Sequence, residues 1–285
     1  MGCTGCYGPL ACGGTAPWGR KEGLMLYLRL LRVFFNVSLL NELAYRANFW
    51  VQLFQTLISF ATAIGGLAVI FSHTDDLGGW RPEELVMLLG VYFIMVGLVG
   101  MTITPSLDQL MADVREGTLD YRLTKPASSQ FLVSFREVRI WRATDLLLGI
   151  GLLVAGATRL GVLGEPAQVI AFPVALIAGA IIIYSVRLVL ATLTFWVIRT
   201  ENIMVIFTSL FQAGRYPVGI YPNWLRAILT FIVPVSFATT VPTEALAGRL
   251  SLGTLLTALG VAVALLIVSA AFWRFGLRHY TGASA

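Results

Sequence analysis

The chain has 285 residues, of which 57% are hydrophobic and 12% are charged, and its formal net charge is +5. Soluble domains carry about 25% charged residues, so this composition excludes an ordinary soluble fold. The hydrophobic residues form blocks of about 20, enough for a helix to cross the hydrocarbon core of a bilayer. The basic residues lie at the ends of these blocks rather than on one face, which argues against nucleic acid as a partner. We therefore predict an all-α membrane protein embedded in a lipid bilayer.

The membrane domain is predicted to cover residues 24–280, between two short tails. The first tail, residues 1–23, contains all three cysteines of the sequence: Cys3, Cys6 and Cys12. Three thiols alone do not complete a tetrahedral metal site, so we expect a disordered tail that binds no metal. Residues 281–285 form the second tail.

The first element of the domain, residues 24–46, is apolar but contains several polar side chains within one arc of a helix, Arg29 and Arg32 among them. This pattern predicts a helix that lies in the cytoplasmic interface of the membrane. The alternative is a buried or spanning helix. Two arginines in the middle of the segment make a spanning helix costly.

Hydrophobic blocks predict about six transmembrane helices in the rest of the domain. They cover about residues 47–71, 85–104, 143–163, 168–198, 203–220 and 254–273. With the N-terminus inside, 14 Lys and Arg residues flank the inner ends of the spans and 5 flank the outer ends. Because basic residues accumulate on the cytoplasmic side, we expect both termini in the cytoplasm.

The longest polar connection, residues 106–142, follows the second span. It begins as a continuation of the helix, with Gly117 as a candidate C-terminal cap. Residues 128–138 then form a short amphipathic piece. A connection of this length can build a docking helix. The alternative is a solvated basic loop.

Prolines interrupt the apolar stretch 214–248, so it is not predicted to be one straight span. Broken helices at membrane depth are tolerated where protein or a water-filled cavity covers them. We predict a re-entrant helical hairpin that acts as an outer gate. A kinked helix with a loop is the alternative. The candidate gate residues are Pro217, Tyr221, Pro222, Pro234 and Glu244.

Residues suited to catalysis are scarce in this sequence. Neither of its two histidines, His73 and His279, lies in a predicted span, and no Gly-x-Ser-x-Gly or His-Glu-x-x-His motif is present. No predicted span has at its centre the acidic residue that an ion-coupled carrier uses. We therefore expect no catalytic site, metal site or cofactor in this chain.

Four features together indicate a family. These are the interfacial helix, the segment Gly117-Thr-Leu-Asp-Tyr-Arg-Leu-Thr-Lys-Pro126, the short turn 164–166, and the broken hairpin from Tyr216 to Glu244. As a set they resemble the integral-membrane subunits (permeases) of type-2 ABC exporters, in the subgroup with two different permeases and one ATPase. The resemblance covers about residues 24–280.

The resemblance implies a transmembrane subunit of an ATP-driven exporter that forms half of the translocation pathway. The other half would be a second permease, the same chain or a paralogue. A dimer of ABC ATPase subunits would bind ATP and Mg²⁺, so hydrolysis would occur in the partner. The interfacial helix and the helix near residues 128–138 would dock on the ATPases. The candidate docking residues are Arg29, Arg32, Ser128, Phe131, Phe135 and Arg136.

The implied location is the plasma (inner) membrane of a prokaryote. Two other functions stay open: a secondary carrier or channel without an ATPase, and a structural or insertase-like membrane protein. An intramembrane acid pair or an inverted repeat would favour the carrier, and the sequence shows neither.

One charged residue, Arg187, lies deep within a predicted span. It precedes Arg199 by twelve residues, which is about 18 Å along a helix and near mid-membrane. A charge there costs about 2.5–3.5 kcal/mol, so we expect the side chain to face protein or water. It either snorkels or bonds freed backbone carbonyls, or it lines the pathway and positions an anionic or polar group of the substrate.

Overall fold

The structure is a computed structural model that describes residues 29–40, 46–74, 76–124, 128–162, 165–197 and 200–280. Both predicted tails lie outside these ranges. The first described helix comprises residues 29–40. The helices after it, with 3₁₀ and π turns marked η, are α2 (Arg46–Phe71), α3 (Pro82–Leu98), η1 (Val99–Ile103), α4 (Thr104–Glu116), α5 (Leu119–Leu123), α6 (Ser129–Ser134), η2 (Ile140–Arg142), α7 (Ala143–Leu160), α8 (Pro166–Thr192), η4 (Leu193–Phe195), α9 (Thr200–Phe211), η5 (Gln212–Arg215), η6 (Val218–Ile220), α10 (Asn223–Ala227), η7 (Ile228–Ile232), η8 (Ser236–Thr240), α11 (Val241–Leu246) and α12 (Leu252–His279).

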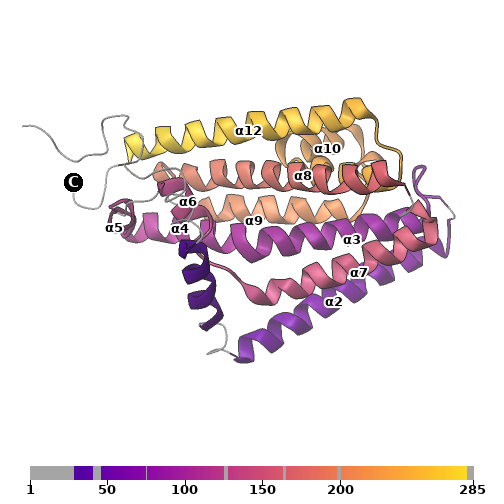
Figure 1. Ribbon diagram of the computed structural model, residues 1–285, viewed down its shortest axis with the longest axis horizontal. Coiled ribbons are helices and arrows are strands. Elements are labelled where there is room, and N and C mark those ends of the chain that lie inside the picture. The colour runs from indigo at the N-terminus through magenta and orange to yellow at the C-terminus, as the bar shows by residue number, and fades with distance from the viewer. Residues whose placement is uncertain are drawn as a thin grey trace, which may run out of the picture.

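Several of these helices are long and apolar enough to cross a bilayer. Within the described ranges there are 5, namely Phe49–Phe71, Pro82–Glu116, Ile140–Leu160, Pro166–Phe195 and Leu252–His279, or up to 6 if a bent pair is one span. They run side by side along the length of the molecule (Figure 1). The prediction of an all-α membrane protein with about six spans is confirmed.

The second span is longer than predicted, because the helix continues beyond residue 104 to Glu116. Pro105 lies in the first turn of α4, and the π turn η1 precedes it. A proline has no N–H to donate to the carbonyl four residues earlier, which is that of Met101. The backbone N–H of Arg139 donates to this carbonyl instead, at 2.8 Å. The helix ends at Gly117, a left-handed cap with φ of 72°, as the sequence predicted.

The fifth span is shorter than predicted. The helix α9 has 12 residues, or about 18 Å, and the chain is in the 3₁₀ turn η5 by Gln212. Tyr216 then has an extended backbone, with φ of −124° and ψ of 154°. The residue before a proline disfavours the helical conformation, and Pro217 follows Tyr216. The predicted range 203–220 therefore contains a helix and a turn rather than one span.

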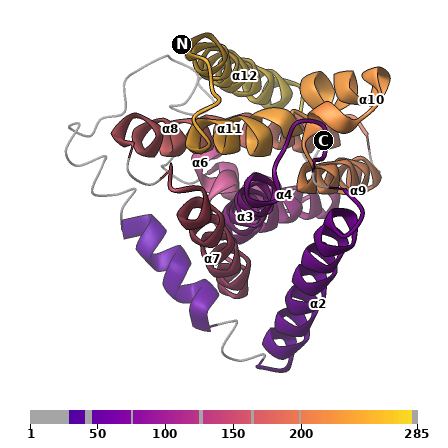
Figure 2. The ribbon, with the colours of Figure 1, turned by 90° about the vertical axis from the view of Figure 1, so that its right-hand side faces the viewer.

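The helix α3 lies in the middle of the bundle, with α2, α7, α8, α9 and α11 around it (Figure 2). It contacts α7 most closely where glycines on the two helices meet. A Cβ atom added to Gly90 would lie 2.6 Å from the backbone nitrogen of Leu153, and one added to Gly149 would lie 2.6 Å from that of Ile94. Small residues at such crossings let helix backbones approach within the membrane.

The predicted break in the stretch 214–248 is present: two half-helices, Asn223–Ile232 and Ser236–Leu246, are bent by 75°, as in a broken span or a re-entrant loop. That the pair is re-entrant stays a prediction. The break contains Pro234, and neither half is long enough to cross the hydrocarbon core by itself. The second half packs closely on α8, because a Cβ atom on Gly179 would lie 2.6 Å from the carbonyl oxygen of Phe237.

An ion pair fastens the start of α3 to the turn before α12. The guanidinium of Arg249 donates to the carboxylate of Glu84 at 2.8 Å and to the carbonyl of Gly79 at 2.8 Å. The same carboxylate accepts from the backbone N–H of Arg81 at 2.9 Å. The two bonds of Arg249 join segments that lie far apart in the sequence, at the end of the bundle where the two half-helices lie.

The α3–α7 contact gives the first prediction. Replacing Gly149 by leucine inserts a side chain where the two backbones touch, and such overpacking costs about 1–3 kcal/mol or more. We expect Gly149→Leu to lower the thermal unfolding temperature of the purified protein measurably. The matched control is Gly151→Leu on the same helix, because a Cβ atom on Gly151 meets nothing within 4 Å. Equal unfolding temperatures for the two variants would contradict the close contact.

Candidate functional site

Short helices and charged residues gather at one end of the bundle. The helix of residues 29–40 lies across the direction of the long helices there, close to α4 and α6, and α5 and the end of α12 lie at the same end (Figure 1). One contact joins this helix to the chain before η2, because the backbone N–H of Val138 donates to the hydroxyl of Ser38 at 3.2 Å.

The predicted docking helix is shorter than the range 128–138, since α6 comprises Ser129–Ser134 and ends at Phe135. The rings of Phe131 and Phe135 lie 5.6 Å apart, so they share one face as predicted, and the ring of Phe135 stacks on Tyr184 of α8 at 6.3 Å. Phe135 is 36% exposed and Phe131 is half-buried. Their docking role stays a prediction.

The other predicted docking residues are distributed around this end. The side chains of Arg29, Arg32 and Ser128 are exposed. Arg136 is half-buried and lies 3.5 Å from the carboxylate of Asp113. Burial raises the pKa of the neighbouring Glu137, and the charges of Arg136 and Arg139 act in the opposite direction.

The predicted gate residues lie at the opposite end, around the bent hairpin. Pro217 and Pro234 are buried, Glu244 is half-buried, and Pro222 is exposed. The half-buried Tyr221 donates its hydroxyl to the carbonyl of Ala213 at 3.0 Å. The structure places these residues in one region, and their gating role stays a prediction.

A cavity of about 340 Å³ lies between α2, α3, α8 and α9, and the segment before α7 contributes to its wall. The residues on its wall that bear a charge are Arg139, Arg142, Asp145, Arg187 and Arg215. Four arginines and one aspartate make this a basic cavity within the membrane domain.

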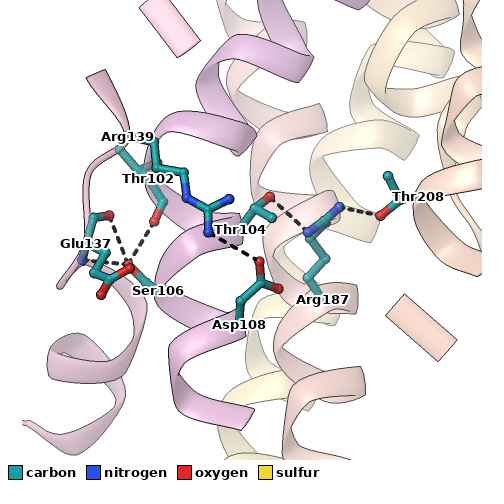
Figure 3. Close-up of polar contacts among 8 residues, drawn as sticks. All are labelled: Thr102, Thr104, Ser106, Asp108, Glu137, Arg139, Arg187 and Thr208. Carbon is teal, nitrogen blue, oxygen red and sulfur yellow. Dashed lines mark hydrogen bonds and ion pairs between the residues drawn. The ribbon is translucent and has the colours of Figure 1, made fainter. Parts of the chain in front are cut away.

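Arg187 is the most deeply buried of these arginines, with 6% of its surface exposed. Its guanidinium donates to the hydroxyl of Thr104 on α4 at 2.9 Å and to that of Thr208 on α9 at 3.1 Å (Figure 3). It also lies over the ring of Phe207 at 5.2 Å. The side chain therefore faces protein and the cavity, as expected. Its partners are side-chain hydroxyls, whereas the sequence interpretation considered backbone carbonyls.

The freed carbonyl of Met101 helps to place two further arginines. Its hydrogen bond with the N–H of Arg139 holds the chain that enters η2 against the end of η1. The side chain of Arg139 then reaches Asp108 at 3.9 Å (Figure 3). Arg142, three residues later, pairs with Asp145 at 2.9 Å and lies over the ring of Trp141 at 4.3 Å.

Arg215 of η5 also lines the cavity. Its guanidinium donates to the hydroxyl of Ser59 on α2 at 3.0 Å and lies 5.4 Å from the ring centre of Tyr92 on α3. The bond to Ser59 joins α2 to the turn η5 across the cavity, so the position of α2 and the shape of the cavity are linked.

The sequence interpretation identified Arg187 and missed the rest of this site. Arg142 and Arg215 were assigned to the flanks of spans, where basic residues are common. A second signal was present on α2, where Gln52, Gln55, Thr56 and Ser59 all line the cavity. Their spacing puts them on one face of a helix, and such a polar stripe in a spanning helix marks a buried or water-facing side.

Comparison with known families agrees with this architecture. The family model for ABC-2 family transporter proteins matches residues 57–284. The chain belongs to this family. No curated protein and no solved structure matches it. This ABC-2 family protein is therefore a multi-pass transmembrane subunit of an ABC transporter, and its family implies in general an ABC ATPase as partner. The predicted family is confirmed at this level, and the match does not include the helix of residues 29–40.

The cavity gives the second prediction, made in a background with Cys3, Cys6 and Cys12 replaced by serine. A thiol at position 55 faces the cavity, and one at position 58 is on an exposed apolar stretch of α2, where Ile58 is 49% exposed. Thiols react as thiolates, which need water. We expect Gln55→Cys to react at least about tenfold faster than Ile58→Cys with a hydrophilic methanethiosulfonate. Equal rates would show that water does not enter the cavity.

Proposed function

We propose that this protein forms half of the translocation pathway of an ATP-driven exporter and docks a dimer of ABC ATPase subunits. The ATPases bind and hydrolyse ATP with Mg²⁺, and this chain is non-catalytic. Closure of the ATPases would then shift the spans in alternating access. The observation that supports the docking is the position of α6 and of residues 29–40 together at one end of the bundle.

The docking surface comprises residues 29–40 and α6 with Phe135. Arg29 and Arg32 are exposed, and apolar side chains beside them, such as Val33, are exposed as well. An amphipathic helix of this kind lies in a membrane interface, where a soluble ATPase can reach it. The backbone N–H of Val138 donates to the hydroxyl of Ser38, which joins residues 29–40 to the chain between α6 and η2. In this proposal a movement of residues 29–40 would be passed through that chain to the segment that lines the cavity.

The second half of the pathway is a second permease, either the same chain or a paralogue, as in the subgroup with two different permeases and one ATPase. Large apolar side chains are exposed on α2 and α9, among them Phe54, Leu57, Val205 and Ile206. These faces lie beside the cavity, so a partner there would complete its wall. The outer gate in this proposal is the bent hairpin with Pro217, Tyr221, Pro222, Pro234 and Glu244.

The protein lies in the plasma (inner) membrane of a prokaryote, with both termini in the cytoplasm. The described start of the chain and the end of α12 lie at the same end of the bundle (Figure 1). When the arginines of the cavity are left out, 12 Lys and Arg residues of the sequence still flank the predicted inner ends of the spans and 4 flank the outer ends. Because basic residues accumulate on the cytoplasmic side, this end is the inner one.

A secondary carrier or a channel is the competing function. The family match favours the ATPase-driven transporter, because ABC-2 proteins are subunits of ABC transporters. The arginines of the cavity also differ from the acidic residues that proton- and sodium-coupled carriers use within the membrane.

Docking is tested by replacing Phe131 and Phe135 together with aspartate. We expect the double variant to lose co-purification of the ATPase by about tenfold or more, because two charges would then oppose an apolar contact. The double leucine variant keeps an apolar surface and should retain the ATPase.

A structural control addresses the stacking of Phe135 on Tyr184. Tyr184→Leu removes the stack together with the hydrogen bonds between the Tyr184 hydroxyl and Gln130 and Ser134 of α6. Tyr184→Phe removes these hydrogen bonds alone. Both variants keep Phe131 and Phe135, so both should retain the ATPase. Retention of the ATPase by the double aspartate variant, or its loss from both Tyr184 variants as well, would refute docking through this pair.

Orientation is tested with single cysteines in the background without native cysteines. Asp76 and Ser128 are both exposed, at opposite ends of the bundle. We expect Asp76→Cys to react with an impermeant reagent in intact cells, and Ser128→Cys to react only after permeabilisation. The reverse pattern would place both termini outside.

A further inference from the structure

The basic cavity contains more positive charge than the protein neutralises. Arg142 pairs with Asp145, and Arg139 lies near Asp108. Among the described residues, no carboxylate oxygen lies within 4.0 Å of a guanidinium nitrogen of Arg187 or Arg215, so neither arginine forms an ion pair there. Both are held by hydroxyls and aromatic faces, which carry no formal charge. The carboxylate of Asp108 attracts Arg187 from a longer distance and is shared with Arg139, so two aspartates face four arginines.

These two guanidinium groups also keep donors that nothing accepts. The Nε atoms of Arg187 and Arg215 are buried and have no hydrogen-bond partner among the described residues. Removing a charge from water costs several kcal/mol unless a counter-charge compensates for it. The contacts within the protein therefore fix the two arginines without neutralising them, which is the arrangement expected around an anion that comes from outside the chain.

The type of side chain indicates the type of anion. The planar fork of arginine matches the oxygens of phosphate and carboxylate and binds them in pairs. Arg187 of α8 and Arg215 of η5 both line the cavity, and they come from different elements. A cavity of about 340 Å³ accommodates a small headgroup rather than a whole large ligand.

The remaining walls are of two kinds. Amide and hydroxyl side chains of α2, such as Gln52 and Gln55, offer donors to oxygen atoms. Apolar side chains of α3, α8 and α9, among them Val96, Ile183 and Phe211, cover the other side. The cavity thus has a polar wall beside an apolar wall, at membrane depth. This arrangement suits an amphiphile whose oxyanion headgroup contacts the polar wall and whose apolar part contacts the other.

We propose that this cavity binds an oxyanion, a phosphate or carboxylate group, between Arg187 and Arg215. The group belongs to an anionic amphiphile or to a free anion, and in either case it defines the substrate class of the exporter. Only the statement that the bound anion is the substrate of the exporter rests on the proposed function. Binding of the anion does not require the ATPase, so the two proposals can fail separately.

The test measures the electrostatic potential in the cavity and whether a ligand occupies the cavity. It uses the full-length protein in nanodiscs of phosphatidylcholine, which has no net charge. The reporter is Gln55→Cys in the background without native cysteines. We expect the anionic sulfonatoethyl methanethiosulfonate to react about tenfold faster than the cationic trimethylammonioethyl reagent, relative to their rates at Asp76→Cys, because a basic cavity concentrates anions. Equal relative rates would overturn the proposal.

Substitutions then assign the charge to residues. Arg187→Gln and Arg215→Gln should each reduce this preference several-fold, while Arg159→Gln, an exposed arginine outside the cavity, should leave it unchanged. Arg187→Lys retains the charge and should retain the preference, which a merely misfolded variant would not. A preference that survives both glutamine variants would overturn the assignment.

Added ligands distinguish the source of the oxyanion. Dodecyl phosphate that protects Gln55→Cys, without protection by inorganic phosphate, supports an anionic amphiphile. Protection by inorganic phosphate as well supports a free oxyanion. Protection should be weaker in Arg187→Lys, which lacks the planar fork. No protection by either compound, or equal protection by neutral dodecyl maltoside, would overturn the proposal.

Discussion

The second span holds the segment that enters η2 through backbone hydrogen bonds, chief among them the bond from the N–H of Arg139 to the carbonyl of Met101. The hydroxyl of Ser106 adds bonds with the backbone N–H and carbonyl of Glu137. In the hydrocarbon region every backbone polar group must find a partner within the protein. Pro105 removes the usual partner of Met101, and the chain that enters η2 supplies a new one. A local defect in one helix thereby fixes the position of a distant segment, together with the arginines that follow it.

The same requirement explains how a charge can lie at membrane depth. Arg187 is tolerated because Thr104 and Thr208 accept its hydrogen bonds and the ring of Phe207 faces it. These contacts come from two parts of the chain, Thr104 on α4 and the neighbours Phe207 and Thr208 on α9, so the position of Arg187 depends on the packing of α4, α8 and α9 together. The close contact of α3 with α7, through Gly90 and Gly149, leaves the opposite side of α3 available to form the cavity.

Much of the fold could be predicted from the sequence, because hydrophobic length, glycine caps and proline breaks act locally. Gly117 and the break near Pro234 were found in this way. The early end of α9 could have been found too, since the residue before Pro217 disfavours a helix. The cavity could not be predicted in full. Arg142 and Arg215 lie beside the ends of spans, where the positive-inside rule already accounts for arginines, and only the three-dimensional packing brings them to Arg187.

The helix α2 contributes little to the buried core, since Thr56, Ala63 and Leu67 are the buried residues described on it. Among the described residues, the hydrogen bond that joins it to the rest of the cavity wall is the one from Arg215 to Ser59. The helix also packs on α3, where the rings of Phe60 and Phe93 lie 5.4 Å apart. A change in the tilt of α2 would therefore disturb this bond and this ring contact, but would require no repacking of α3 with α7. The wall formed by α2 can consequently move more easily than the walls formed by α3, α8 and α9. A conformational change driven from outside the protein would therefore change the volume of the cavity mainly by moving α2.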